Sequence, residues 1–250
     1  MTITRRTITL IRSLRKKKER DEHHLFIVEG DKLVAEVLNS SIEIKEVFAL
    51  KNWCEQNIEF NPTIVSEKEL GQISCLSTPN KVLALCYIPE IDKIQNSKLK
   101  GLTLVLDGLS DPGNLGTIIR IADWFNIRRL ICSFNSVDVY NPKVIQSTMG
   151  SFLRVNVSYL NVSDYLSQLS SSIPVYGMDM GAESIYAKQI PQDVVVVIGN
   201  ESHGISKGLM GYIKGFIAIP SFGQAESLNA AIATGILCSE YRRCNESIQM

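Results

Sequence analysis

Three polar segments hold the residues of this sequence whose types and spacing could do chemistry, and each follows a short apolar run. We call residues 107–120 the first segment, 199–204 the second and 220–229 the third. Their notable residues are, in chain order, Asn114, Gly116, Arg120, Gly199, Asn200, Glu201, Gly204, Pro220, Ser227, Leu228 and Asn229. Carboxylate, amide, hydroxyl and guanidinium groups of this kind can orient a substrate, bind an anion or carry a proton.

Each segment also has a purely structural interpretation. Asn114 and Ser227 could cap helices, and Gly199 and Gly204 could form turns. Arg120 fits such an interpretation less well, because an arginine on a buried, otherwise apolar helix needs an anion or a carboxylate beside it. Neither G-x-G-x-x-G nor G-x-x-x-x-G-K-[ST] is present, which argues against a dinucleotide fold and a P-loop nucleotidase.

An α/β sheet is expected to position these segments. Short apolar runs that do not alternate with polar residues predict buried parallel strands, at 102–106, 130–132, 175–178, 194–198 and 216–219. Helical patterns lie between or after them, at 117–125, 143–149, 162–169, 206–213 and 228–243. Since ligands bind at the carboxyl ends of parallel strands, the three segments should meet at one edge of the sheet.

The first half of the chain predicts a smaller α/β unit. Strands are expected at 25–28, 47–50 and 82–88, and a helix at 31–38 with Asp31 as its N-cap. Ser66 and Glu69 have the spacing of a capping box, which predicts a helix that ends near residue 73. A polar stretch bounded by Pro89 and Gly101 follows and reads as a linker. The expected division is 1–92, a linker at 93–100, and 101–250.

Composition restricts the class of protein. With 250 residues, 45% of them hydrophobic and 21% charged, the chain can bury a core, which excludes a disordered protein. Its longest wholly apolar run, Val194–Ile198, is far short of the about 20 residues that a membrane helix needs. Because the first twenty residues also lack the apolar core of a signal peptide, we expect a cytoplasmic protein. The six cysteines and three histidines show no metal-ligand spacing, so no metal site is expected.

Charge is balanced overall but not along the chain. There are 26 basic and 26 acidic residues, and the region 101–250 has 10 basic and 12 acidic ones. The first twenty residues are strongly basic, and we call seven of them the basic strip: Arg5, Arg6, Arg12, Arg15, Lys16, Lys17 and Lys18. The strip could be a solvated helix face, or a surface that contacts phosphate groups of RNA.

Together the three segments resemble the three motifs of the SpoU/TrmH group of SPOUT methyltransferases. The first resembles the N-x-G-x-x-x-R motif, the second G-N-E-x-x-G, and the third I-x-I-P…S-L-N, here beginning at Ile217. The residues 147–150 also resemble a family S-x-G segment. The resemblance covers 101–250, and departures are Asn126 in place of a glycine and Ser221-Phe222 after the motif-three proline. Residues 5–90 resemble, more faintly, an L30e-like substrate-binding domain, mainly through the stretch 26–30.

The resemblance implies a fold and an activity. The fold would be a parallel-sheet domain with a C-terminal trefoil knot, plus the small N-terminal α/β domain. The activity would be transfer of a methyl group from S-adenosyl-L-methionine to a ribose 2′-hydroxyl of RNA. Family positions imply cofactor binding by Gly199, Asn200, Ile219, Pro220 and Leu228. They imply catalytic roles for Asn114, Arg120, Glu201, Ser227 and Asn229, with RNA binding by the basic strip.

The roles of the catalytic set are expectations drawn from this family. Accounts of it often make Arg120 the base, but a guanidinium with a pKa above about 12 accepts a proton poorly. A bidentate clamp on an RNA phosphate is physically easier. Asn114 would orient Arg120 or the ribose, and Glu201 would pair with Arg120 or accept the proton. Ser227 and Asn229 would position the acceptor.

Several alternatives stay open at this stage. The chain could be a non-catalytic RNA-binding or assembly protein on the same scaffold, or it could methylate a base. Transfer RNA is an alternative substrate, although the added L30e-like domain favours ribosomal RNA. The resemblance also implies a homodimer, with the arginine near the subunit interface. The apolar residues of the last helix, Ala231, Ile232, Leu237 and Tyr241, could line that interface or simply belong to the core.

Overall fold

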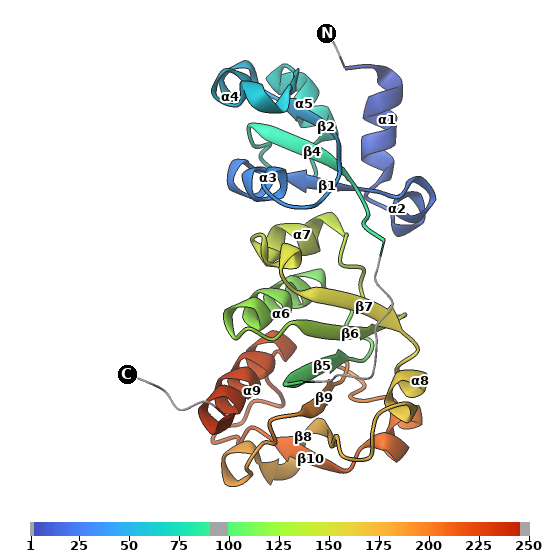
Figure 1. Ribbon diagram of the computed structural model, residues 1–250, viewed down its shortest axis with the longest axis vertical. Coiled ribbons are helices and arrows are strands. Elements are labelled where there is room, and N and C mark those ends of the chain that lie inside the picture. The colour runs from blue at the N-terminus through green and yellow to red at the C-terminus, as the bar shows by residue number, and fades with distance from the viewer. Residues whose placement is uncertain (1–2, 91–99, 246–250) are drawn as a thin grey trace. The chain divides into compact units, whose positions relative to one another are not determined.

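A six-stranded parallel sheet carries the three segments in the computed structural model, which describes residues 3–90 and 100–245 (Figure 1). Its strand order is β10-β8-β9-β5-β6-β7. The strands are β5 (Leu102–Leu106), β6 (Arg129–Ser133), β7 (Asn156–Leu160), β8 (Val175–Ser184), β9 (Val194–Ile198) and β10 (Gly215–Ala218). Five of the six were expected. The edge strand β7 was missed, because Asn156 and Ser158 interrupt its apolar pattern.

The centre of this sheet places the first and second segments side by side. Every residue of β5 and β9 is buried, as their continuous apolar sequences predict. Leu106, the last residue of β5, is in register with Ile198 of β9 and Cys132 of β6. Strands β6 and β7 lie on one side of β5 in the sheet, and the later strands β9, β8 and β10 lie on its other side. The strand order therefore reverses at β5, and ligands bind at such a switch point in parallel sheets.

Helices cover both faces of this sheet. α6 (Pro112–Trp124) and α9 (Ala230–Asn245) lie on one face, and α8 (Val162–Ser167) lies on the other (Figure 1). The predicted helix at 206–213 is instead a 3₁₀ helix, Lys207–Tyr212. α6 begins five residues earlier than expected. Asp111 caps it by accepting a hydrogen bond from the Asn114 backbone N–H at 2.8 Å, and Pro112 occupies the first turn, a favoured place for proline.

Packing of α9 on α6 fixes the distance between the two helices. A β-carbon at Gly235 of α9 would lie 3.6 Å from Cδ1 of Ile121, so the small residue allows close contact. At the other end, Nε of Arg242 donates to the Phe125 carbonyl at 2.7 Å, just after α6 ends. Asn126, which stands where the resemblance implies a glycine, has a φ of 51°, a left-handed conformation that asparagine tolerates.

A four-stranded sheet in the order β1-β4-β2-β3 forms the first unit of the chain. Its elements are α1 (Arg5–Ser13), α2 (Lys17–His23), β1 (Leu25–Glu29), α3 (Asp31–Leu38), β2 (Ile44–Ala49), α4 (Lys51–Gln56), β3 (Thr63–Ile64), α5 (Glu67–Ile73) and β4 (Val82–Tyr87). The Ser66–Glu69 capping box is confirmed. The prediction that Asp31 caps α3 is wrong: Gly30 holds the cap position, and Asp31 Oδ1 accepts a hydrogen bond from Trp53 Nε1 at 2.7 Å.

The segment Asp138–Leu153 belongs to the first unit, which differs from the expected division at residue 101. It contains α7 (Pro142–Thr148), whose Ile145 is buried in the same apolar cluster as Phe26. Asp138 accepts a hydrogen bond at 2.9 Å from Nε of Arg20, an arginine that is only 2% exposed. Arg20 is therefore structural, unlike the exposed basic strip. The expected linker at 93–100 falls, except for residue 100, outside the described residues.

Most thiols of the chain lie in its core. Burial raises the pKa of Cys86, Cys132 and Cys238 to about 12 in each case, so these thiols are unreactive near neutral pH. In the part of the chain that the structure describes, His, Cys, Asp and Glu side chains form no group of three or more that could hold a metal ion. No helix within the described ranges has the length and apolar character to span a membrane.

Candidate active site

A chain of side-chain hydrogen bonds joins the three segments. Nδ2 of Asn114 donates to Oε1 of Glu201 at 2.7 Å, and Oδ1 of Asn114 accepts from Nδ2 of Asn229 at 2.8 Å. Asn114 comes from the first turn of α6, and Asn229 from the residue before α9. Because the two helices pack together, the amides of Asn114 and Asn229 are held at a fixed separation. Three residues predicted to be catalytic thus form one connected group.

Asn114 is available for this group because Asp111 caps α6. The structural interpretation of Asn114 as the cap is therefore wrong, and its side chain is left to bridge the segments. Asn229 has two roles, since its Oδ1 also accepts from the backbone N–H of Ala231 at 2.9 Å and so caps α9. The interpretation of Ser227 as that cap is wrong for the same reason.

The second segment is a tight loop that presents Glu201. Asn200 and Gly204 exchange two backbone hydrogen bonds, of 3.0 and 2.9 Å, and Gly204 has a φ of 65° that suits glycine. Nδ2 of Asn200 donates to the Gly108 carbonyl at 2.8 Å. The buried Asp107 accepts a hydrogen bond from the Ser206 backbone N–H at 2.7 Å. The end of β5 thereby fixes the loop after β9.

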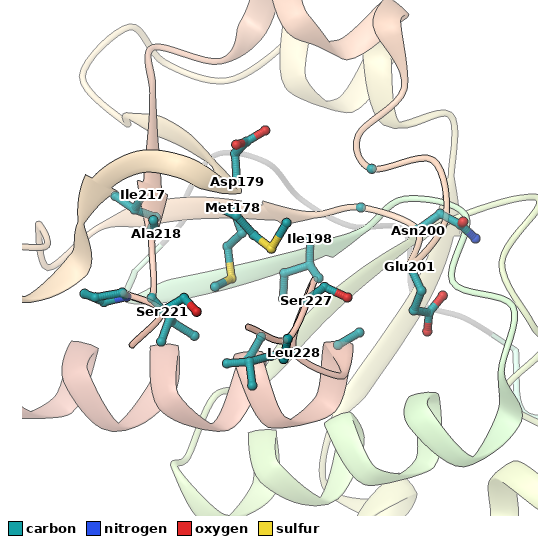
Figure 2. A pocket seen from close by; sticks show the side chains of 18 of the residues that line it. Met178, Asp179, Ile198, Asn200, Glu201, Ile217, Ala218, Ser221, Ser227 and Leu228 are labelled. Atoms are coloured by element: carbon teal, nitrogen blue, oxygen red, sulfur yellow. The ribbon is translucent and has the colours of Figure 1, made fainter. Parts of the chain in front are cut away.

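A cavity of about 550 Å³ opens beside this group, at the carboxyl ends of β9 and β10 and along the middle of β8. The volume is within the range of about 300–1,000 Å³ that small-molecule sites occupy. Asn200 and Glu201 lie at one end and Ile217 and Ala218 at the other, with Leu228 below (Figure 2). Its walls are mostly apolar with a few polar groups, which is typical of a cofactor site.

All the residues expected to bind the cofactor line the cavity, namely Gly199, Asn200, Ile219, Pro220 and Leu228. Glu201 and Ser227 of the catalytic set line it as well. Asn114, Arg120 and Asn229 do not belong to the lining.

Arg120 makes no hydrogen bond or ion pair with the connected group. Its side chain is exposed, so the expectation of a buried arginine on an apolar helix is wrong. Among the described residues it has no hydrogen-bond or ion-pair partner, and Glu201 is bonded to Asn114 instead of Arg120. The periodicity explains the exposure: Thr117, Arg120 and Trp124 are spaced by three and four residues, and all three are exposed.

Sequence reasoning missed several residues of the site. Met178, Asp179 and Met180 of β8 line the cavity, and Figure 2 shows Asp179 beside Met178. Their signal was available, because they stand at the end of the expected strand at 175–178, where ligands are bound. Asp107 was also missed, although it is a carboxylate directly after a buried apolar strand.

The cavity fits a nucleoside-type cofactor with a positively charged centre. Apolar side chains on both sides suit a base and a methyl group, and the carboxylates of Asp179 and Glu201 favour a cation. The tight fold of the second segment on itself requires glycine at position 199. A β-carbon there would lie 2.5 Å from the Gly204 carbonyl oxygen.

Comparisons with known proteins agree with this geometry. The model of the SpoU rRNA methylase family matches residues 101–239, and that of the MRM3-like substrate-binding domain matches 5–84. A Bacillus subtilis protein, the 23S rRNA (guanosine(2553)-2′-O)-methyltransferase RlmP, is 31% identical over an alignment of 239 residues that covers 92% of this chain and 94% of that protein.

Two solved structures extend the comparison to the fold. A putative RNA methyltransferase of the TrmH family from Porphyromonas gingivalis is 36% identical, with a TM-score of 0.84 over 96% of this chain and 98% of that one. An rRNA methyltransferase from Sinorhizobium meliloti, solved with bound AdoMet, is 28% identical, with a TM-score of 0.85 over 99% of both chains.

Proposed function

The chain belongs to the SpoU rRNA methylase family, and from this premise we propose how it acts. It is an S-adenosylmethionine-dependent methyltransferase whose acceptor is a ribose 2′-hydroxyl of ribosomal RNA. The observation that carries the proposal is the connected group of Asn114, Glu201 and Asn229, of which Glu201 lines an apolar cavity. A scaffold kept only for binding RNA would have no need of such a group, which weighs against a non-catalytic protein.

We assign the work of the site to these residues. Gly199, Ile219 and Leu228, which line the cavity, would hold the adenosine part of the cofactor through backbone groups, and the bound cofactor would supply an activated methyl group. Methyl transfer to oxygen is in line, so most of the rate enhancement comes from orientation in a dry site. We propose that Asn114 and Glu201 orient the ribose and that the carboxylate of Glu201 accepts the hydroxyl proton.

Alkaline hydrolysis tests whether the methyl group goes to a ribose. A 2′-O-methyl group removes the nucleophile that cleaves the neighbouring phosphodiester bond, so the methylated position should resist alkali. We expect 23S rRNA treated with this protein and S-adenosylmethionine to show one new resistant position. A methylated product that alkali still cleaves there would assign the reaction to a base. A methylated tRNA with unmethylated rRNA would assign it to the alternative substrate.

The basic strip is proposed to supply the long-range attraction to RNA. All seven of its residues are exposed, whereas Arg20 is buried against Asp138. Arg15 also donates to the Ser74 carbonyl at 2.5 Å, so it contributes to the fold of the unit as well. The region 101–250 carries a slight excess of acidic residues and does not attract phosphate by net charge.

Replacement of Arg12, Lys16 and Lys18 by alanine is expected to weaken RNA binding and to flatten its salt dependence. Each lost phosphate contact lowers the slope of log K against log salt by about 0.7–0.9, so the slope should fall by about 2 to 3. The matched control replaces the exposed Lys32, Lys51 and Lys68 of the same unit. RNA affinity is measured by filter binding at several salt concentrations. An equal loss of affinity in both variants would show that the basic strip is only a solvated helix face.

We also propose a two-fold homodimer, for which α6 and α9 provide a surface. Trp124 of α6 is 84% exposed and Ile232 of α9 is 56% exposed, on two helices that pack together. The other apolar residues expected at this interface, Ala231, Leu237 and Tyr241, are core residues and not part of the surface. Sedimentation at the mass of a single chain would contradict the dimer.

A further inference from the structure

A rigid turn after β6 presents an aromatic side chain beside the active site. Phe134 stands at its tip and is 66% exposed, and Asn135 next to it is also exposed. Burial of an aromatic ring is strongly favourable in water, so an exposed ring on a fixed support is a candidate binding surface.

Two buried serines hold this turn against the first segment. Oγ of Ser133 accepts a hydrogen bond from the Gly108 backbone N–H at 2.7 Å, and Oγ of Ser136 accepts from the Leu109 backbone N–H at 3.2 Å. The two hydroxyl groups are 3.0 Å apart, and the serines are 8% and 6% exposed. The position of the Phe134 backbone is thereby tied to the loop that leads to Asn114.

The turn is continuous with the connected group of the active site. Gly108 lies between the two, since a β-carbon there would be 3.2 Å from Nδ2 of Asn135 and 3.8 Å from Cβ of Asn200. Asn200 is followed by Glu201, which binds Asn114. Within the part of the chain that the structure describes, the Asn135 side chain has no hydrogen-bond partner.

We propose that Phe134 is a stacking platform for a nucleobase of the RNA substrate, next to the nucleotide that is methylated. This inference rests on the proposed function. Unpaired RNA bases stack on aromatic side chains, and amides read their polar edges, so Phe134 and Asn135 together match one unstacked base. Residues 101–250 have no net positive charge, so they do not attract the RNA phosphates by net charge. A neutral ring provides a contact with RNA that does not depend on charge.

Three substitutions at one position separate stacking from other roles. We expect Phe134→Ala and Phe134→Leu to raise KM for a 23S rRNA transcript about 10-fold or more, because each loses the ring. Phe134→Trp should stay within about threefold of the unchanged protein, since it keeps an aromatic face. S-adenosylmethionine affinity should be the same in all variants. The matched control is Tyr186→Ala, another aromatic residue, 54% exposed and absent from the cavity lining.

The outcomes distinguish this proposal from the proposed function. Equal KM values for Phe134→Leu and Phe134→Trp would show that the contact is apolar packing and not stacking. A change in sedimentation on Phe134→Ala would show that the turn contacts a second copy of the chain. Either result contradicts the proposal that Phe134 stacks on a base. If the unchanged protein transfers no methyl group to the transcript, the proposed function fails. Ultraviolet crosslinking then decides the platform by itself, because a stacked base should crosslink to the peptide that contains Phe134, and absence of that crosslink refutes it.

Discussion

Replacement of Arg120 by alanine is expected to lower kcat by about 100-fold or more while the affinity for S-adenosylmethionine changes less than about threefold. Arg120 is exposed, is absent from the cavity lining and has no partner among the described residues. Among the described residues, therefore, no hydrogen bond or ion pair depends on its charge. We propose that in the complex its guanidinium clamps a phosphate and stabilises charge that develops at the 2′-oxygen.

Single-turnover kinetics and titration calorimetry check this expectation together. Arg120→Lys should recover only part of the rate, because lysine keeps the charge but loses the bidentate geometry. Thr117→Ala, on the same exposed stripe of α6, serves as the matched control. Loss of cofactor binding in parallel with turnover would show that Arg120 is a structural residue, against its exposed position.

The sequence predicted the location of the site better than its internal connections. The sequences of β5 and β9 are uninterrupted apolar runs, which predict buried parallel strands. Because ligands bind at the carboxyl ends of such strands, the first and second segments were predicted to lie together. The bond between Asn114 and Glu201 could not be predicted in this way. It depends on Asp111 taking the cap of α6, and capping by Asp or by Asn is nearly equivalent in propensity.

Two other features depend on tertiary packing. The segment Asp138–Leu153 follows β6 in the chain, yet its Ile145 is buried with Phe26 of the first unit, and no local pattern indicates that partner. The exposure of Arg120 could have been predicted from the helical periodicity of α6. Ile118, Ile119 and Ala122 define the buried face of this helix, and Arg120 does not lie on that face. The C-terminal knot stays a prediction.

For Gly199→Ala, in contrast to Arg120→Ala, we expect cofactor affinity to fall together with turnover. Its new β-carbon would meet the backbone of Gly204 and Ile205, and backbone atoms cannot rotate away as a flexible side chain can. The loop of the second segment would have to shift, and with it both the cavity wall and Glu201.

Because the site tolerates little misplacement, we expect cofactor affinity to fall by about 10-fold or more and turnover to fall at least as far. Gly208→Ala is the matched control, since a β-carbon there has no atom within 4 Å. Calorimetry with S-adenosylmethionine measures the difference, and circular dichroism establishes that both variants are folded. If Gly199→Ala binds the cofactor as tightly as Gly208→Ala does, then the close packing of Gly199 against the backbone of Gly204 and Ile205 is not what shapes the cofactor site.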